Sequence, residues 1–131
     1  MRGTAIILTI WLSIALTPLV AQTYNSVSEA FKAGAFDSVI EMAQPLAEGG
    51  SAEAQSVMGY VYQNGLGISK NTNEAIRWYK LAADQGLASA QNNLGQIYKN
   101  SASTDQDYSK AFKWLLLAAK GGLFQLLLTL V

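Results

Sequence analysis

The chain has 131 residues, no Cys and no His, nine basic against nine acidic side chains, and a charged fraction of 14%, where soluble domains usually carry about 25%. Without Cys and His it has no disulfide, no thiolate or imidazole metal ligand, and no Ser-His or Cys-His pair for nucleophilic catalysis. Its zero net charge argues against a nucleic-acid binder, which needs clustered Lys and Arg. We therefore expect no catalytic residue, no metal, no cofactor and no nucleic-acid partner.

Residues 1–21 have the layout of a secretory signal peptide, with Arg2, an uncharged apolar core, the helix breaker Pro18 and the small residue Ala21. Pro18 interrupts the apolar run before it reaches the roughly 20 residues of a membrane-spanning helix. We expect cleavage after Ala21 and a periplasmic or secreted protein without a membrane segment. Because Leu19 is larger than the side chain preferred three positions before a cut, retention as an uncleaved anchor is the alternative.

Residues 24–50 are predicted to form two helices. The first covers about residues 26–33 and stops at Gly34, and the second covers about residues 36–50. Pro45 lies within the second helix and should kink it, because proline removes a backbone donor. Residues 36–50 match the second helix of the repeat described next, and residues 26–33 would be its partner helix, so we interpret residues 24–50 as a degenerate N-terminal cap repeat.

An internal repeat of 36 residues follows, with residues 51–86 aligned on residues 87–122. Twelve of the 36 aligned positions are identical. The identical pairs are Ala52/Ala88, Ala54/Ala90, Gln55/Gln91, Gly59/Gly95, Tyr62/Tyr98, Asn64/Asn100, Ala75/Ala111, Trp78/Trp114, Leu81/Leu117, Ala82/Ala118, Ala83/Ala119 and Gly86/Gly122.

Each unit is predicted to contain two helices. In the first unit, the first helix covers about residues 52–63 and is ended by the glycines of the Asn64-Gly65-Leu66-Gly67 loop. The second helix covers about residues 73–85, with Asn73 as its N-cap and Gly86 as its stop. The second unit repeats the pattern to Gly122, with Asp107 or Ser109 helping to cap its second helix.

Small residues at repeated positions indicate close helix packing. Gly59 lies inside a predicted helix, where glycine costs about 1 kcal/mol relative to alanine, so we expect a close helix contact there. Tyr62 and Trp78 are expected to fill the space beside the small residues. Trp78 and Trp114 share one repeat phase, which favours core packing over sugar stacking.

These residues resemble the Sel1-like repeat (SLR) family, a branch of the tetratricopeptide-like solenoids. The resemblance covers about residues 29–123 and rests mainly on Ala54-Gln55, Gly59-Tyr60-Val61-Tyr62, Asn64-Gly65-Leu66-Gly67 and Ala75-Ile76-Arg77-Trp78, with their counterparts 36 residues later. It implies an all-α, right-handed α-solenoid that acts as an adaptor or scaffold for protein-protein interaction, and bacterial members that look like this are often exported. No small-molecule substrate is expected.

In related solenoids the first helices line the concave side, which makes their polar positions candidates for binding a protein or peptide. Three such positions occur in the first repeat and again 36 residues later in the second, and they are Ser56, Tyr60, Gln63, Asn92, Gln96 and Lys99. An exposed aromatic residue beside amides and a charge suits peptide recognition. An ordinary polar helix face is the alternative.

Residues 123–131 depart from the pattern, because the family would begin another unit here. Seven of these nine residues are apolar and none is charged, whereas solenoid ends normally carry a polar cap. We interpret the segment as the stub of a truncated repeat, which either folds over the helix of Trp114 or is exposed and prone to aggregate. Two other functions stay open: a truncated non-functional remnant, and a β-lactamase-like secreted repeat enzyme, although such relatives depend on paired cysteines.

Overall fold

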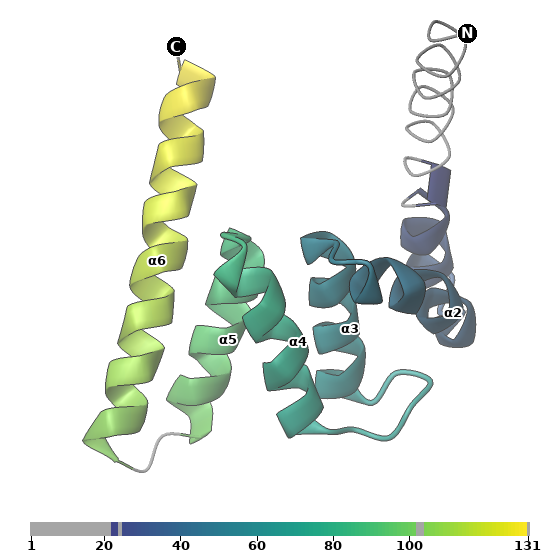
Figure 1. The fold of residues 1–131 in the computed structure, drawn as a ribbon, viewed down its shortest axis with the longest axis horizontal. Helices are drawn as coiled ribbons and strands as arrows, with labels where there is room; N and C mark the ends of the chain where they lie inside the picture. Colours follow the sequence, from purple (N-terminus) through teal and green to yellow (C-terminus); the bar gives the residue numbers. More distant parts are fainter. Residues whose placement is uncertain (1–21, 24, 102–103, 131) are drawn as a thin grey trace, which may run out of the picture. The chain divides into compact units, whose positions relative to one another are not determined.

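The computed structural model describes residues 22–23, 25–101 and 104–130, so the predicted signal peptide lies outside the described residues. The described residues form helices joined by turns, with no strand among them (Figure 1). The chain divides into two compact units, residues 1–42 and 43–131.

In the first unit, residues 25–32 are helical and the helix ends at Gly34, which has a left-handed φ of 72°. The N–H of Ala35 donates to the carbonyl of Ala30 at 2.9 Å and so closes the turn. The rings of Phe31 and Phe36 meet edge to face, with centroids 5.7 Å apart. Helix α2, Phe36–Glu48, follows and contains Pro45 as predicted.

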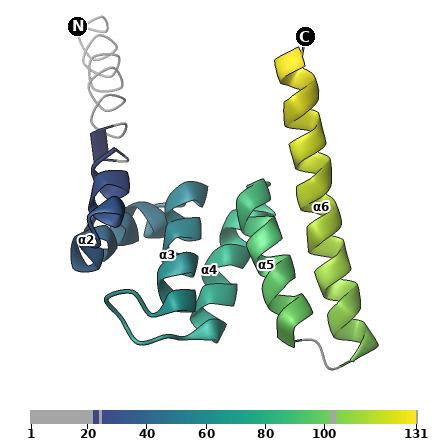
Figure 2. The same ribbon diagram turned by 180° about the vertical axis from the view of Figure 1, so that it is seen from behind.

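The second unit contains helices α3 (Ala52–Asn64), α4 (Thr72–Asp84), α5 (Ala88–Ser101) and α6 (Asp105–Leu130). They lie side by side in chain order (Figures 1 and 2). Helix α3 ends at Gly65 and α4 ends at Gly86, both with positive φ. The N–H of Gly86 donates to the Ala83 carbonyl, and the next N–H donates to that of Ala82, which is the hydrogen-bond pattern of a Schellman motif. The predicted helix pair and its two stops are confirmed for the first repeat, residues 51–86.

The N-caps of the second helices lie upstream of the predicted positions. Helix α4 is capped by Asn71, not Asn73, because the Asn71 side chain accepts from the N–H of Glu74 at 3.1 Å. Helix α6 begins after Thr104, whose hydroxyl oxygen accepts from the N–H of Asp107 at 3.3 Å. Asp107 in turn accepts from the Thr104 hydroxyl at 2.9 Å. Asp107 therefore completes a cap at Thr104, and Ser109 lies inside the helix.

Glycines inside the first helices allow close contact with the second helices, as predicted. A Cβ added at Gly59 would lie 2.7 Å from the ring of Tyr79, and one added at Gly95 would lie 2.7 Å from Leu115. The side chain opposite Gly59 is thus Tyr79 and not Trp78. Trp78 and Trp114 are both buried, which confirms core packing for these two residues.

A buried glutamine connects each first helix to the helix before it. The Gln55 amide donates to the carbonyl of Ala47, and the Gln91 amide donates to that of Ala83, both at 3.1 Å. The two bonds are related by the repeat period, which accounts for the glutamine at both positions. Gln55 also accepts from Gln85 at 2.8 Å. This second bond has no equivalent in the second repeat, where Gly121 occupies the position of Gln85.

The main core lies between α4, α5 and α6. It consists of alanines and a few larger side chains, namely Ala75, Tyr79, Ala82, Ala83, Ala90, Leu94, Ile97 and Trp114. Small residues on facing helices let the backbones approach, and the larger side chains fill the remaining space. This core packs α5 between α4 and α6.

Helix α6 differs from the expectation at the end of the chain. It continues through Gly122 to Leu130 instead of ending at the glycine. Leu123, Phe124 and Leu128 are exposed, so this segment does not fold over the helix of Trp114. The reason is local, since Leu127 occupies the repeat position of Gln91 and has no amide that could tie a reversed chain to the preceding helix.

Candidate functional site

The six predicted binding residues lie on α3 and α5, the first helices of the two repeats. Their exposure differs: Tyr60, Asn92, Gln96 and Lys99 are exposed, whereas Ser56 and Gln63 are half-buried. The polar face predicted from the repeat phase is therefore present on α5, where all three residues are accessible. Of the three predicted residues on α3, only Tyr60 is exposed to the same degree.

Gln63 is held in place by a buried phenol. The hydroxyl of Tyr79 donates to Gln63 Oε1 at 2.9 Å, which leaves the Gln63 amide nitrogen available for another partner. Burial raises the pKa of Tyr79 far above its ordinary value, and a hydrogen bond with Asn93 opposes that shift. The phenol is thus a neutral, fixed group that links α4 to both first helices.

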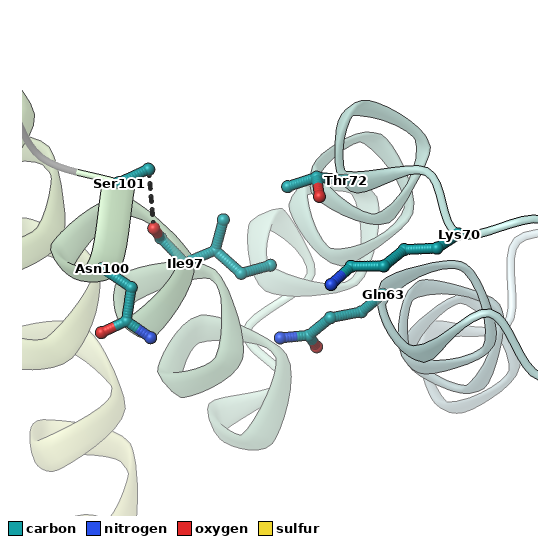
Figure 3. Close-up of a pocket in the computed structure, with 6 residues that line it drawn as sticks. All are labelled: Gln63, Lys70, Thr72, Ile97, Asn100 and Ser101. Atoms are coloured by element: carbon teal, nitrogen blue, oxygen red, sulfur yellow. Dashed lines mark hydrogen bonds between the residues drawn. The ribbon is translucent and has the colours of Figure 1, made fainter.

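An open pocket of about 210 Å³ adjoins Gln63. It is lined by residues from the end of α3, the loop that follows it, the start of α4 and the end of α5, namely Gln63, Lys70, Thr72, Ile97, Asn100 and Ser101. The Lys70 ammonium and the amide nitrogen of Gln63 point into the space between the helices, with the Asn100 amide on the opposite side (Figure 3). Ser101 is engaged elsewhere, because its hydroxyl donates to the Ile97 carbonyl at 2.8 Å.

The loop after α3 places Lys70 at this pocket. Gly65 adopts a left-handed conformation, with φ 65°, that turns the chain back. The N–H of Asn71 then donates to the Tyr62 carbonyl at 2.9 Å. The folded loop leaves so little room that a Cβ on Gly65 would lie 3.2 Å from Lys70. The lysine is therefore fixed at its backbone while its side chain reaches over the pocket.

Electrostatically the pocket offers a positive charge and amide donors. In the described part of the chain, the salt bridges join Arg77 to Glu74, Lys80 to Asp84 and Lys110 to Asp107. Lys70 has no carboxylate within salt-bridge distance among these residues. An ammonium accompanied by amide N–H groups favours a carboxylate ligand, since charge-assisted hydrogen bonds are the stronger ones.

Of the six predicted binding residues only Gln63 lines this pocket, and the prediction did not include Lys70, Thr72 or Asn100. The available signal was the Gly65-Leu66-Gly67 turn, which implies a loop folded back on α3. The described residues contain no group of three or more His, Asp or Glu side chains that could hold a metal ion.

Antiparallel helix pairs that repeat every 36 residues and stack in chain order define an α-helical repeat protein. The family model for the Sel1 repeat matches residues 52–87 and 88–123. The chain belongs to the Sel1 repeat family. Proteins of this family generally mediate protein-protein interactions and generally have no enzymatic activity.

Two solved structures share the fold. A Sel1 repeat protein from Oxalobacter formigenes is 35% identical over 72% of this chain, with a TM-score of 0.63. The protein c5321, a protective antigen present in uropathogenic Escherichia coli strains displaying an SLR fold, is 36% identical over 65% of this chain, with a TM-score of 0.60. The chain spans only 39% and 18% of these two proteins. No curated protein matches the chain.

Proposed function

We propose that the protein is an adaptor that binds another protein or a peptide through the exposed face of α3 and α5. The observation that carries this proposal is the pocket at Lys70, which adjoins the predicted face at Gln63. A carboxylate of the partner, from an Asp, a Glu or a chain end, would enter the pocket and meet the ammonium. Tyr60 and Gln96 would contact the rest of the peptide.

The specificity of such a site depends on charge more than on area. Lys70 stands without a described ion-pair partner, so a carboxylate gains attraction without displacing an existing salt bridge. The neutral amides of Gln63 and Asn100 add hydrogen bonds that a hydrophobic ligand cannot use. An acidic peptide is therefore favoured over a basic or an apolar one, and binding should weaken as salt concentration rises.

A displayed library of random peptides, selected on the full chain, tests this proposal. We expect selected peptides to be enriched in Asp and Glu and their binding to weaken roughly tenfold in the Lys70→Gln variant. Tyr60→Ala combined with Gln96→Ala should also weaken binding. The matched control is Lys80→Gln, because Lys80 is an exposed lysine on α4 that is paired with Asp84. Selected peptides without acidic enrichment, bound equally by the Lys70 variant, would contradict the proposal.

We also propose that the adaptor works outside the cytoplasm of a bacterium, after removal of residues 1–21. The support is the sequence layout around Pro18 and Ala21. Expression of the full chain in a Gram-negative host, followed by fractionation and N-terminal sequencing, provides the measurement. A periplasmic product that begins at Gln22 is expected, whereas a membrane-bound product that retains Met1 would support the anchor alternative.

A further inference from the structure

The end of α3 carries the chain's only Asn-Gly pair, Asn64-Gly65. In such a pair the backbone nitrogen of the glycine can attack the side-chain carbonyl carbon of the asparagine, because glycine has no Cβ to obstruct the approach. The attack forms an N–Cγ bond, which closes a five-membered succinimide ring, and breaks the Cγ–Nδ2 bond. The amide nitrogen leaves as ammonia with the proton of the glycine N–H. Water then opens the ring at either carbonyl and yields aspartate or isoaspartate.

The folded chain restrains both reacting groups. The Asn64 side-chain nitrogen, which is the leaving group, donates to the Tyr60 carbonyl at 2.9 Å. The Gly65 N–H donates to the Val61 carbonyl. Asn64 is also the last residue of α3, and a helical ψ of about −42° keeps its Cβ apart from the next backbone nitrogen, whereas ring closure requires these two atoms to eclipse. The ring therefore closes only after the last turn of α3 has opened.

The hydrogen bonds that close this turn are local. The Val61 carbonyl accepts from the Gly65 N–H and, at 3.1 Å, from the next N–H along the chain, so one acceptor holds both donors. The loop beyond stays tied to α3 independently, because the N–H of Asn71 donates to the Tyr62 carbonyl. Asn64 is exposed, and exposed hydrogen bonds at a helix end open at a small fraction of the free energy of unfolding.

The same position of the second repeat differs in two ways. The pair there is Asn100-Ser101, and the serine has a Cβ that obstructs the attacking nitrogen. Helix α5 also continues through Ser101, so Asn100 is not its last residue. The Ser101 hydroxyl donates to the Ile97 carbonyl at 2.8 Å. Asn100 is therefore an internal reference for Asn64 within the same molecule.

We propose that Asn64 is a site of spontaneous deamidation in the folded protein and that local opening of the last turn of α3 sets its rate. Isoaspartate adds a methylene to the main chain directly before Gly65, whose left-handed turn packs against Lys70. Aspartate adds a negative charge at the C-terminal end of a helix, where the dipole disfavours it. Both products act on the loop that carries Lys70 without changing a residue that lines the pocket.

The test is peptide mapping by mass spectrometry of the full chain during incubation at mildly alkaline pH, with aspartate and isoaspartate products separated by chromatography. We expect Asn64 to convert before Asn100 and the other asparagines. We also expect conversion in the folded chain to be roughly tenfold slower than in concentrated urea, because the turn must open first. The matched control is Asn64→Gln, which would need a six-membered ring and should show no conversion at this position.

The dependence of the rate on urea decides how the site opens. Below the unfolding transition, a local opening exposes little surface, so the rate at Asn64 should stay nearly constant as urea is added. A rate that climbs steeply with urea in this range overturns the proposal, because the reaction then requires global unfolding. Equal rates in the folded and unfolded chains also overturn it, as does conversion of Asn100 before Asn64 or no conversion at Asn64 in the folded chain.

Discussion

Replacing Gly59 with Ala tests the close contact between α3 and α4. Within an exposed helix this change would stabilise the chain by about 1 kcal/mol. Here the added Cβ would lie 2.7–2.8 Å from three atoms of the Tyr79 ring. Unstrained carbon atoms lie about 3.5–4.0 Å apart, so the ring or the helix must move by nearly 1 Å.

Tyr79 has little freedom to move. Its side chain is fully buried and packs in the same core as Ala90 and Leu94, and its hydroxyl is held by Gln63. Overpacking of a well-filled core costs about 1–3 kcal/mol, and a clash against a ring face belongs at the upper end. After subtraction of the helix gain, Gly59→Ala should lower the free energy of unfolding by about 2 kcal/mol, which lowers Tm by on the order of 10 °C.

Thermal and urea unfolding, followed by circular dichroism at 222 nm, measure this loss. The control is Ser56→Ala on the same helix, which gains a few tenths of a kcal/mol from helix propensity and meets no ring. If Gly59→Ala proves as stable as the native chain, or more stable, then α3 and α4 are not in the close contact that the structure shows.

Two further predictions concern buried polar groups. Gln91→Leu removes the bond to the Ala83 carbonyl and should lower the free energy of unfolding by about 1 kcal/mol. Gln55→Leu should lower the free energy of unfolding further, because Gln55 also accepts a hydrogen bond from Gln85. The midpoints of urea unfolding measure both losses and rank them. Because burial raises the pKa of Tyr79 in the folded chain, the unfolded chain loses this proton first. Stability should therefore fall as pH rises above 10.0, the ordinary value. A fall of equal size in Tyr79→Phe would contradict this assignment.

Local signals in the sequence were sufficient for most of the helices. Gly65 and Gly86 adopt the left-handed conformation that ends a helix, and this preference depends only on the missing side chain. The repeat phase added the burial of Trp78 and Trp114, because two tryptophans at one position in successive units meet the same neighbours. Predictions of this kind depend on contacts within the repeat, which the period makes visible.

The pocket and the ring opposite Gly59 depend on geometry that the sequence does not display. Lys70 reaches the pocket only because the loop folds back, with the N–H of Asn71 bonded to the Tyr62 carbonyl. Whether Trp78 or Tyr79 faces Gly59 is decided by about 100° of helix rotation between adjacent residues. A pattern of apolar positions defines a helix face, but it does not resolve neighbours on that face.

The end of α6 shows that a helix-ending glycine permits a stop without enforcing it. Gly86 and Gly122 hold the same repeat position, yet the helix ends at the first and continues through the second. After Gly86 the chain supplies Gln91, whose amide reaches back to the Ala83 carbonyl and holds the reversed chain. After Gly122 that position is Leu127, which cannot donate a hydrogen bond and is a good helix former. The reversal is therefore encoded five residues beyond the glycine, in the side chain that fastens the next helix to the last.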